Sequence, residues 1–261
     1  SVDCWQQGDG EKVICFIHPV GGEVASYKSL FQHLDKATTV YAISDPNLRL
    51  EPGEPLTIQA RAKAYLQALH QKTDQERHNL ELVGWSFGAW VAAEMCRLAE
   101  HQDKSFGYLT MIDPPEPDCG AEIAEHSKEE VQEAFLHDLA PRLNKSHASL
   151  QSQIAPELQQ HLENLVRCCQ LNMAAMRTHV PGELRQTKVH LFVAGQVADG
   201  PLVDPIKPQD HMAKWGQRLP ELIYGEILEA DHYSIMQSPN IERIAEQFFS
   251  DHKQPIRVPS L

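Results

Sequence analysis

The segment 84–88 reads Gly-Trp-Ser-Phe-Gly and places Ser86 between two glycines. A serine hydroxyl that attacks a carbonyl carbon must project from a sharp turn, close to backbone N–H groups that stabilise the resulting oxyanion. The bare pattern is weak, but here it follows a short apolar run and precedes an alanine-rich helical stretch, the setting that this chemistry requires. We therefore expect Ser86 to be a nucleophile and the N–H of Phe87, at a helix N-terminus, to face the negative charge. The alternative is a helix N-cap serine flanked by glycines.

A second glycine-rich segment, 18–22, reads His-Pro-Val-Gly-Gly and follows another apolar run. Two glycines after a strand allow the backbone to fold tightly over a site, so the N–H of Val20 is a candidate for the second oxyanion donor. A glycine pair also marks plain turns. We expect His18 to pack or to form a structural hydrogen bond rather than to catalyse. The Lys and Ser/Thr of a phosphate-binding loop are absent from this segment.

A serine hydroxyl needs a base near neutral pH, and histidine has a suitable pKa. Position selects His232 from the 14 histidines, because it follows the apolar run 222–228 and the chain order for this motif is serine, acid, histidine. A solvent-exposed loop histidine is the alternative. Two acids, Asp113 and Asp199, follow predicted strands and could orient the histidine, and their positions alone do not separate them. Asp231, adjacent to His232, would point elsewhere.

Apolar runs alternate with helical patterns over most of the chain, which is typical of a largely parallel sheet covered by helices. The predicted strands are Val13–Ile17, Thr38–Ile43, Leu80–Val83, Tyr108–Ile112, Val189–Ala194 and Leu222–Leu228. The helices predicted among them span about 24–35, 57–73 with Thr57 as N-cap, 87–99 and 240–250.

The alternation stops after Asp113, where the sequence predicts no strand and two or three helical stretches, near 128–139 and 155–176. An insertion at this point lies beside the carboxyl edge of the sheet, where such folds bind ligands, so we interpret it as a lid. A separate structural subdomain is the alternative. The predicted divisions are a core of 1–113 and 186–251, a helical lid of 114–185 and a tail of 252–261. Three lid residues could line a substrate chamber or simply pack: Leu171, Met173 and Met176.

Composition excludes several classes of protein. The formal net charge of −13 argues against broad nucleic-acid binding and against binding to anionic membrane surfaces. No apolar run reaches the length of a membrane span. The six cysteines form no CxxC pair, so we predict no metal site, no disulfide scaffold and a reducing, cytoplasmic location. The chain shows no secretory signal. It begins with Ser1 rather than Met, which indicates either processing or, as we favour, a domain taken from a longer polypeptide.

Together, these residues resemble a known family. The HPVGG segment, GWSFGA at 84–89, the strand that ends in Asp113, the helical insertion and the late DHY at 231–233 are similar to the terminal thioesterase domains of nonribosomal peptide and polyketide synthases. The resemblance covers about 12–250, and GWSFGA is its most specific part. It implies an α/β-hydrolase fold, mostly parallel with helices on both faces and a helical lid. It also favours Asp113 over Asp199 as the acid, and Val20 and Phe87 as the oxyanion donors. Ala230 departs from the family, which often has glycine there.

The resemblance further implies a substrate and a partner. The substrate would be an acyl, peptidyl or polyketide chain carried as a thioester on the phosphopantetheine arm of a carrier protein, in the same polypeptide. The bound acyl, peptidyl or polyketide chain would be released by hydrolysis or macrocyclisation. No cofactor would be bound to this domain. The alternatives are a free-standing proofreading thioesterase, a general carboxylesterase and a non-catalytic binding module of the same fold.

Overall fold

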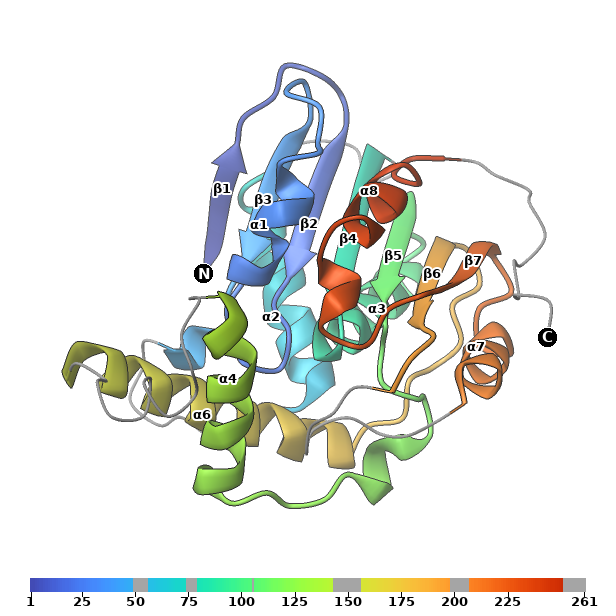
Figure 1. Cartoon of the computed structure of the whole chain (residues 1–261). Helices are drawn as coiled ribbons and strands as arrows, with labels where there is room; N and C mark the ends of the chain where they lie inside the picture. Colours follow the sequence, from blue (N-terminus) through green and yellow to red (C-terminus); the bar gives the residue numbers. More distant parts are fainter. Residues whose placement is uncertain (49–55, 74–78, 105, 143–155, 198–206, 251–261) are drawn as a thin grey trace.

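A central seven-stranded sheet organises the computed structural model of the chain (Figure 1). The structure describes residues 1–48, 56–73, 79–104, 106–142, 156–197 and 207–250. The strands are β1 (Val2–Gln6), β2 (Val13–Ile17), β3 (Thr39–Ile43), β4 (Leu80–Trp85), β5 (Tyr108–Ile112), β6 (Lys188–Ala194) and β7 (Leu222–Leu228). Their order is β1-β3-β2-β4-β5-β6-β7, and all neighbours are parallel except β1, which is antiparallel to β3.

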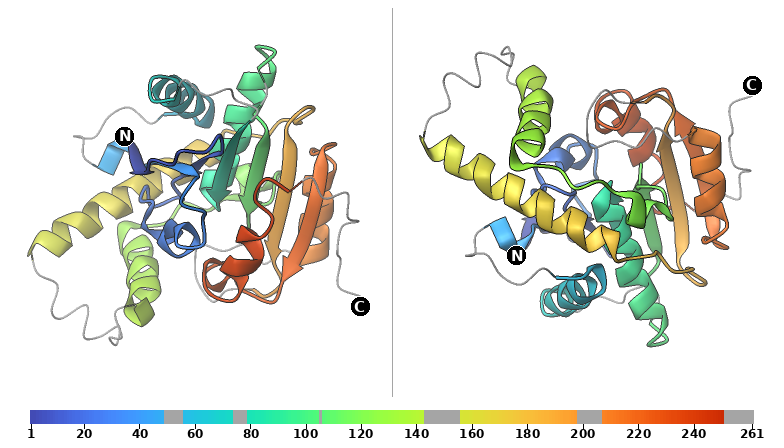
Figure 2. Two further views of the ribbon diagram at one scale, coloured as in Figure 1. Left: turned by 90° about the horizontal axis from the view of Figure 1, so that it is seen from above. Right: turned by 90° about the horizontal axis from the view of Figure 1, so that it is seen from below.

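Helices cover both faces of this sheet (Figure 2). Their bounds are α1 (Lys28–Phe31), α2 (Ile58–His70), α3 (Phe87–Glu100), α4 (Lys128–Arg142), α6 (Pro156–Arg177), α7 (Pro208–Gly216) and α8 (Asn240–Ala245). Successive side chains of a strand point to opposite faces. In β2, Val13, Cys15 and Ile17 therefore join an apolar cluster with α2, α3 and α7, whereas Ile14 and Phe16 join one with α1 and α8. The predicted fold class, a mostly parallel sheet with helices on both faces, is confirmed.

Two helices between β5 and β6, α4 and α6, lie beyond the carboxyl ends of the parallel strands (Figures 1 and 2). They share an apolar cluster composed of Val131, Leu136, Leu162, Val166, Cys169 and Met173. Val20 packs against this cluster, so the two helices lie against the glycine-rich segment 18–22. Between β5 and β6, the described residues form helices and turns and no strand. The predicted tail, 252–261, lies outside the described residues.

Most of the predicted elements are present, but two predicted helices are wrong in extent. The helix predicted near 24–35 is a 3-10 turn, η1 (Ala25–Tyr27), followed by the single turn of α1. The side chain of Asp35 accepts a hydrogen bond from the N–H of Ala37 at 2.9 Å, and this local bond favours a turn over a longer helix. The last helix is also shorter than predicted, because α8 ends at Ala245 and Phe249 has a φ of 59°.

The sequence patterns missed two elements, β1 and α7. Strand β1 is half-exposed at the edge of the sheet and its register shifts between Cys4 and Gln6, so it shows no regular alternation. Helix α7 begins with Pro208 in its first turn, a start signal that was available in the sequence. In the described part of the chain, none of the helices combines the length and apolarity that crossing a bilayer requires.

Candidate active site

Ser86 lies at the turn between β4 and α3, where two glycines let the chain reverse closely. Ser86 has φ 56° and ψ −130°, a conformation that residues with a side chain rarely adopt. A Cβ at Gly84 would lie 2.4 Å from the backbone nitrogen of Ala89. A Cβ at Gly88 would lie 2.4 Å from the carbonyl oxygen of Ile17. The close approach of α3 to β4 and β2 therefore requires both glycines, and the turn directs the serine into a pocket.

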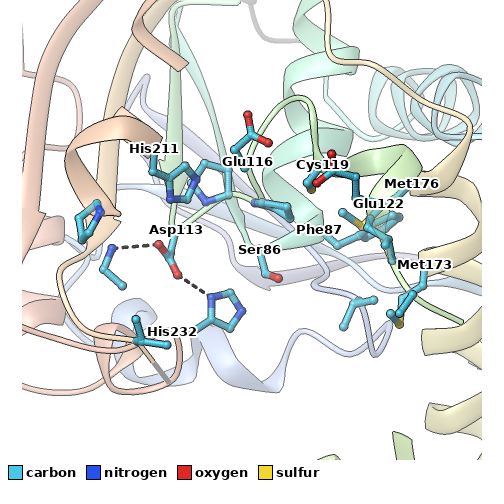
Figure 3. Close-up of a pocket in the computed structure, with 18 of the residues that line it drawn as sticks. Ser86, Phe87, Asp113, Glu116, Cys119, Glu122, Met173, Met176, His211 and His232 are labelled. Carbon is cyan, nitrogen blue, oxygen red and sulfur yellow. Dashed lines mark hydrogen bonds and ion pairs between the residues drawn. The ribbon is translucent and has the colours of Figure 1, made fainter. Parts of the chain in front are cut away.

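Asp113 and His232 come together from distant parts of the chain. Asp113 follows β5 with a φ of 39°, and its N–H donates to the carbonyl oxygen of Phe192 at 2.7 Å. Its Oδ1 accepts a hydrogen bond from the N–H of Ala194 at 2.9 Å. Its Oδ2 lies 2.6 Å from Nδ1 of His232 (Figure 3). The competing acid, Asp199, lies outside the described residues.

The surroundings of Asp113 fix the proton arrangement of this pair. Burial would raise the pKa of Asp113, but the hydrogen bond and charge of His232 and the N–H of Ala194 outweigh it, so the pKa lies below its usual range. An ionised carboxylate only accepts hydrogen bonds, so Nδ1 of His232 must carry a proton. In the neutral ring, Nε2 then has a free lone pair, as a general base requires.

The loop that carries His232 is held by its neighbours. The indole N–H of Trp85 donates to the carbonyl oxygen of His232 at 3.1 Å, and the centroids of the two rings lie 5.2 Å apart. Asp231 accepts hydrogen bonds from the N–H groups of Tyr233 and Ser234, each at 2.8 Å. Asp231 therefore shapes the loop, while Oδ2 of Asp113 is the carboxylate oxygen that lies at Nδ1 of His232.

The two expected oxyanion donors both line the pocket that contains Ser86. Phe87 is the first residue of α3, where backbone N–H groups have no acceptor within the helix. In the described part of the structure, the backbone N–H groups of Val20 and Phe87 donate to no other protein group. Both remain available to an oxygen atom bound next to Ser86.

The pocket has a volume of about 220 Å³ and is lined by the core and by the helical insertion. Met173 and Met176 of α6 line it, whereas Leu171 does not. Figure 3 shows Ser86 between the Asp113–His232 pair and these methionines. Within the described residues, no hydrogen bond joins Ser86 to His232, and such bonds often tighten only when substrate binds.

Sequence reasoning missed several polar residues that line the pocket, among them His211 of α7. Its side chain is buried beside Asp113, and burial lowers its pKa despite the nearby carboxylates and a hydrogen bond to the backbone of Pro114. Pro208 marks the start of α7 in the sequence, but a helix start does not separate His211 from the other histidines. Among the described residues, no three His, Cys, Asp or Glu side chains are placed to hold a metal ion.

One known protein resembles this chain in sequence over part of its length. Nonribosomal peptide synthetase agiA of Aspergillus flavus is 33% identical over 107 residues, which are 39% of this chain and 1% of that protein. The chain thus matches a very small fraction of this much larger relative.

Solved structures share the fold over 95% of this chain. They include holo-AB3403, a four-domain nonribosomal peptide synthetase bound to AMP and glycine (21% identity, TM-score 0.73), of which this chain spans 20%. The NocB thioesterase domain from the nocardicin cluster (18%, TM-score 0.63) and the Vlm2 thioesterase domain (16%, TM-score 0.65) are each matched over 96% of their length. The fold is therefore the α/β-hydrolase fold of these thioesterase domains.

The family model described as Thioesterase domain matches residues 12–251. That span contains the strand–turn–helix serine, the acid–histidine pair and the helical insertion, and it takes up well over half of the sequence. The chain accordingly belongs to the thioesterase domain family.

Proposed function

We propose that this domain is a serine thioesterase that releases an acyl or peptidyl chain from the phosphopantetheine arm of a carrier protein. The observation that carries the proposal is the 2.6 Å contact between Asp113 and His232, in the same pocket as a serine on a strained turn. The family and the synthetase relatives support the choice of a thioester as substrate.

In the first half of the reaction, Nε2 of His232 takes the proton of the Ser86 hydroxyl as Oγ attacks the thioester carbonyl carbon. The N–H groups of Val20 and Phe87 hold the oxyanion. The C–S bond then breaks, the pantetheine thiol leaves with the proton from His232, and the acyl chain remains as an ester on Ser86.

In the second half, His232 deprotonates a nucleophile that attacks this ester and restores the serine. Water gives a free acid, and a hydroxyl or amine of the chain itself gives a macrocycle. We propose that the insertion, 114–185, acts as a lid that controls this choice, because Met173 and Met176 line the pocket and a closed pocket excludes water. The carrier would belong to the same polypeptide, in keeping with the multidomain relatives.

The proposal is tested by intact-protein mass spectrometry after incubation with a panel of acyl and peptidyl pantetheine thioesters. We expect a mass gain equal to the acyl group, confined to the native chain and absent from the Ser86→Ala variant. Chromatography of the released product distinguishes a linear acid from a macrocycle.

Two other outcomes would overturn the proposal. Cleavage of simple oxygen esters without turnover of any thioester would assign the site to a carboxylesterase. No reaction with either class, together with no labelling by a fluorophosphonate, would assign it to a binding module.

A further inference from the structure

Five polar side chains form a buried cluster directly behind the glycine-rich segment 18–22, and the proposed reaction uses none of them. They are His18, Asp45, Arg61, Tyr65 and Asn172, and each is at most 4% exposed. Asn172 belongs to α6, Arg61 and Tyr65 to α2, and Asp45 follows β3. The cluster therefore joins the core to the helical insertion at the position of the proposed oxyanion donor Val20.

One arm of the cluster fixes the peptide plane that carries the N–H of Val20. The carbonyl of that peptide belongs to Pro19, and it accepts hydrogen bonds from Nδ1 of His18 at 2.8 Å and from the N–H of Gly22 at 2.9 Å. In a trans peptide, the C=O and N–H point in opposite directions. Holding the Pro19 oxygen therefore also sets the direction of the Val20 N–H.

His18 is itself held in the tautomer that this bond requires. The Pro19 oxygen can only accept, so Nδ1 of His18 carries the proton, and Nε2 accepts from the hydroxyl of Tyr65 at 2.6 Å. Arg61 lies 3.3 Å from that hydroxyl and 2.7 Å from the carboxylate of Asp45. Burial lowers the pKa of His18 to about 4, against the opposing effect of Asp45, so the ring is neutral at pH 7.

The other arm fixes the next peptide from the side of the insertion. Nδ2 of Asn172 donates to the carbonyl oxygen of Val20 at 2.9 Å and to Oδ2 of Asp45 at 3.0 Å. Asp45 also donates its N–H to the carbonyl oxygen of Gly22 at 2.9 Å. Val20 is thus held on both sides, by His18 from the core and by Asn172 from α6.

From these contacts we infer that His18 and Asn172 are positioning residues that align the backbone N–H of Val20 as an oxyanion donor. Because Asn172 belongs to α6, this alignment depends on the position of α6 against segment 18–22. The inference rests on the proposed function, since it assigns a role in the same reaction. Buried ion pairs such as Arg61–Asp45 contribute little net stability, because desolvation offsets their attraction, so fixing a geometry accounts for the cluster better than stability does.

The test uses a small alkyl fluorophosphonate, which phosphonylates serine without needing the acyl chamber. The oxygen of Ser86 bonds to phosphorus, fluoride leaves, and the hydroxyl proton passes to His232. The phosphoryl oxygen occupies the oxyanion position, so the second-order rate constant reports the alignment of the donors. Asn172→Leu removes the donor at similar size. Asn164→Leu makes the same chemical change on α6 at a side chain that bonds to Gln160 of the same helix and does not line the pocket.

We expect Asn172→Leu to slow phosphonylation by about tenfold to a hundredfold, because complete loss of an oxyanion donor costs about 100- to 1000-fold and misalignment loses part of that. With acyl pantetheine thioesters, kcat should fall while KM stays within about threefold, since the donor acts on the transition state. Asn164→Leu should match the native chain. A native phosphonylation rate in Asn172→Leu, with only KM raised, would overturn the inference and make Asn172 part of acyl binding.

A second pair of variants tests the other arm and keeps the test decisive if Asn172→Leu does not fold. His18→Asn keeps an amide nitrogen near the place of Nδ1 and should retain most of the rate, whereas His18→Leu should lose tenfold or more. Equal phosphonylation rates in these two variants would overturn the inference. A native chain that does not react with the fluorophosphonate at all would instead overturn the proposed function.

Discussion

The pair formed by Asp113 and His232 makes Asp113→Asn a sharp test of the proposed reaction. In the native chain, Oδ1 of Asp113 accepts from the N–H of Ala194 and Oδ2 accepts from Nδ1 of His232. An asparagine offers one acceptor and one donor for these two positions. If its oxygen stays on Ala194, its NH₂ group faces Nδ1, and the imidazole proton must move to Nε2, where it blocks proton transfer from Ser86.

The size of the effect follows from these contacts. To restore the active tautomer, the amide must flip and set its NH₂ group against the N–H of Ala194, and a buried unsatisfied donor costs roughly 2–3 kcal/mol. The imidazolium of His232 then faces a neutral amide oxygen in place of the carboxylate, and the loss of that negative charge costs roughly 2–3 kcal/mol. Together these give about 4–6 kcal/mol in the barrier, or about 10³- to 10⁴-fold in kcat.

The assay is single-turnover acylation of Ser86 by a pantetheine thioester, which separates acylation from release. Asp199→Asn is the matched control, because it makes the same change at the competing acid, and we expect it to stay within about threefold of native. Circular dichroism should show that both variants are folded. Full turnover by Asp113→Asn together with loss of turnover by Asp199→Asn would refute the reasoning and assign the acid to Asp199.

Three other predictions concern stability and the pocket. Gly88→Ala should lower the free energy of unfolding by about 2–3 kcal/mol, because its Cβ would lie 2.4 Å from the Ile17 oxygen and 2.7 Å from the His18 oxygen; an unchanged melting temperature would contradict this. The pKa of His18 is 6.5 in the unfolded chain and about 4 in the folded one, so between these pH values the unfolded state binds the extra proton. The free energy of unfolding should therefore rise by about 3 kcal/mol from pH 4 to 6.5. Urea unfolding should show a smaller rise in His18→Asn, and parallel pH curves for the two proteins would exclude His18 as the cause. Met176→Trp should lower kcat/KM for long acyl thioesters by roughly tenfold and leave acetyl thioester within about threefold, whereas equal losses for both would mean that Met176 lies outside the acyl path.

Local sequence patterns predict the structure correctly where residues close together in the chain determine the backbone conformation. The glycines at 84 and 88 indicate the turn at Ser86, because a side chain there would overlap the neighbouring backbone. The sequence predicts Thr57 as an N-cap, and its hydroxyl accepts a hydrogen bond from the N–H of Ala60 at 3.1 Å. The helix predicted near 24–35 is wrong in extent, because the local hydrogen bond from the N–H of Ala37 to the side chain of Asp35 competes with helical hydrogen bonds there.

The sequence by itself determined the fold class and the positions of Ser86 and of the loop containing His232, because strand–turn–helix patterns and chain order depend on residues close together in the chain. Only the tertiary structure decided that the carboxylate of Asp113 lies 2.6 Å from His232, that His211 lines the pocket and that Asn172 holds the carbonyl of Val20. These contacts span 119 residues between Asp113 and His232 and 152 between Val20 and Asn172. Such pairs are set by how the strands and the inserted helices pack around one sheet edge, and packing at that distance leaves no periodic signal in a single sequence.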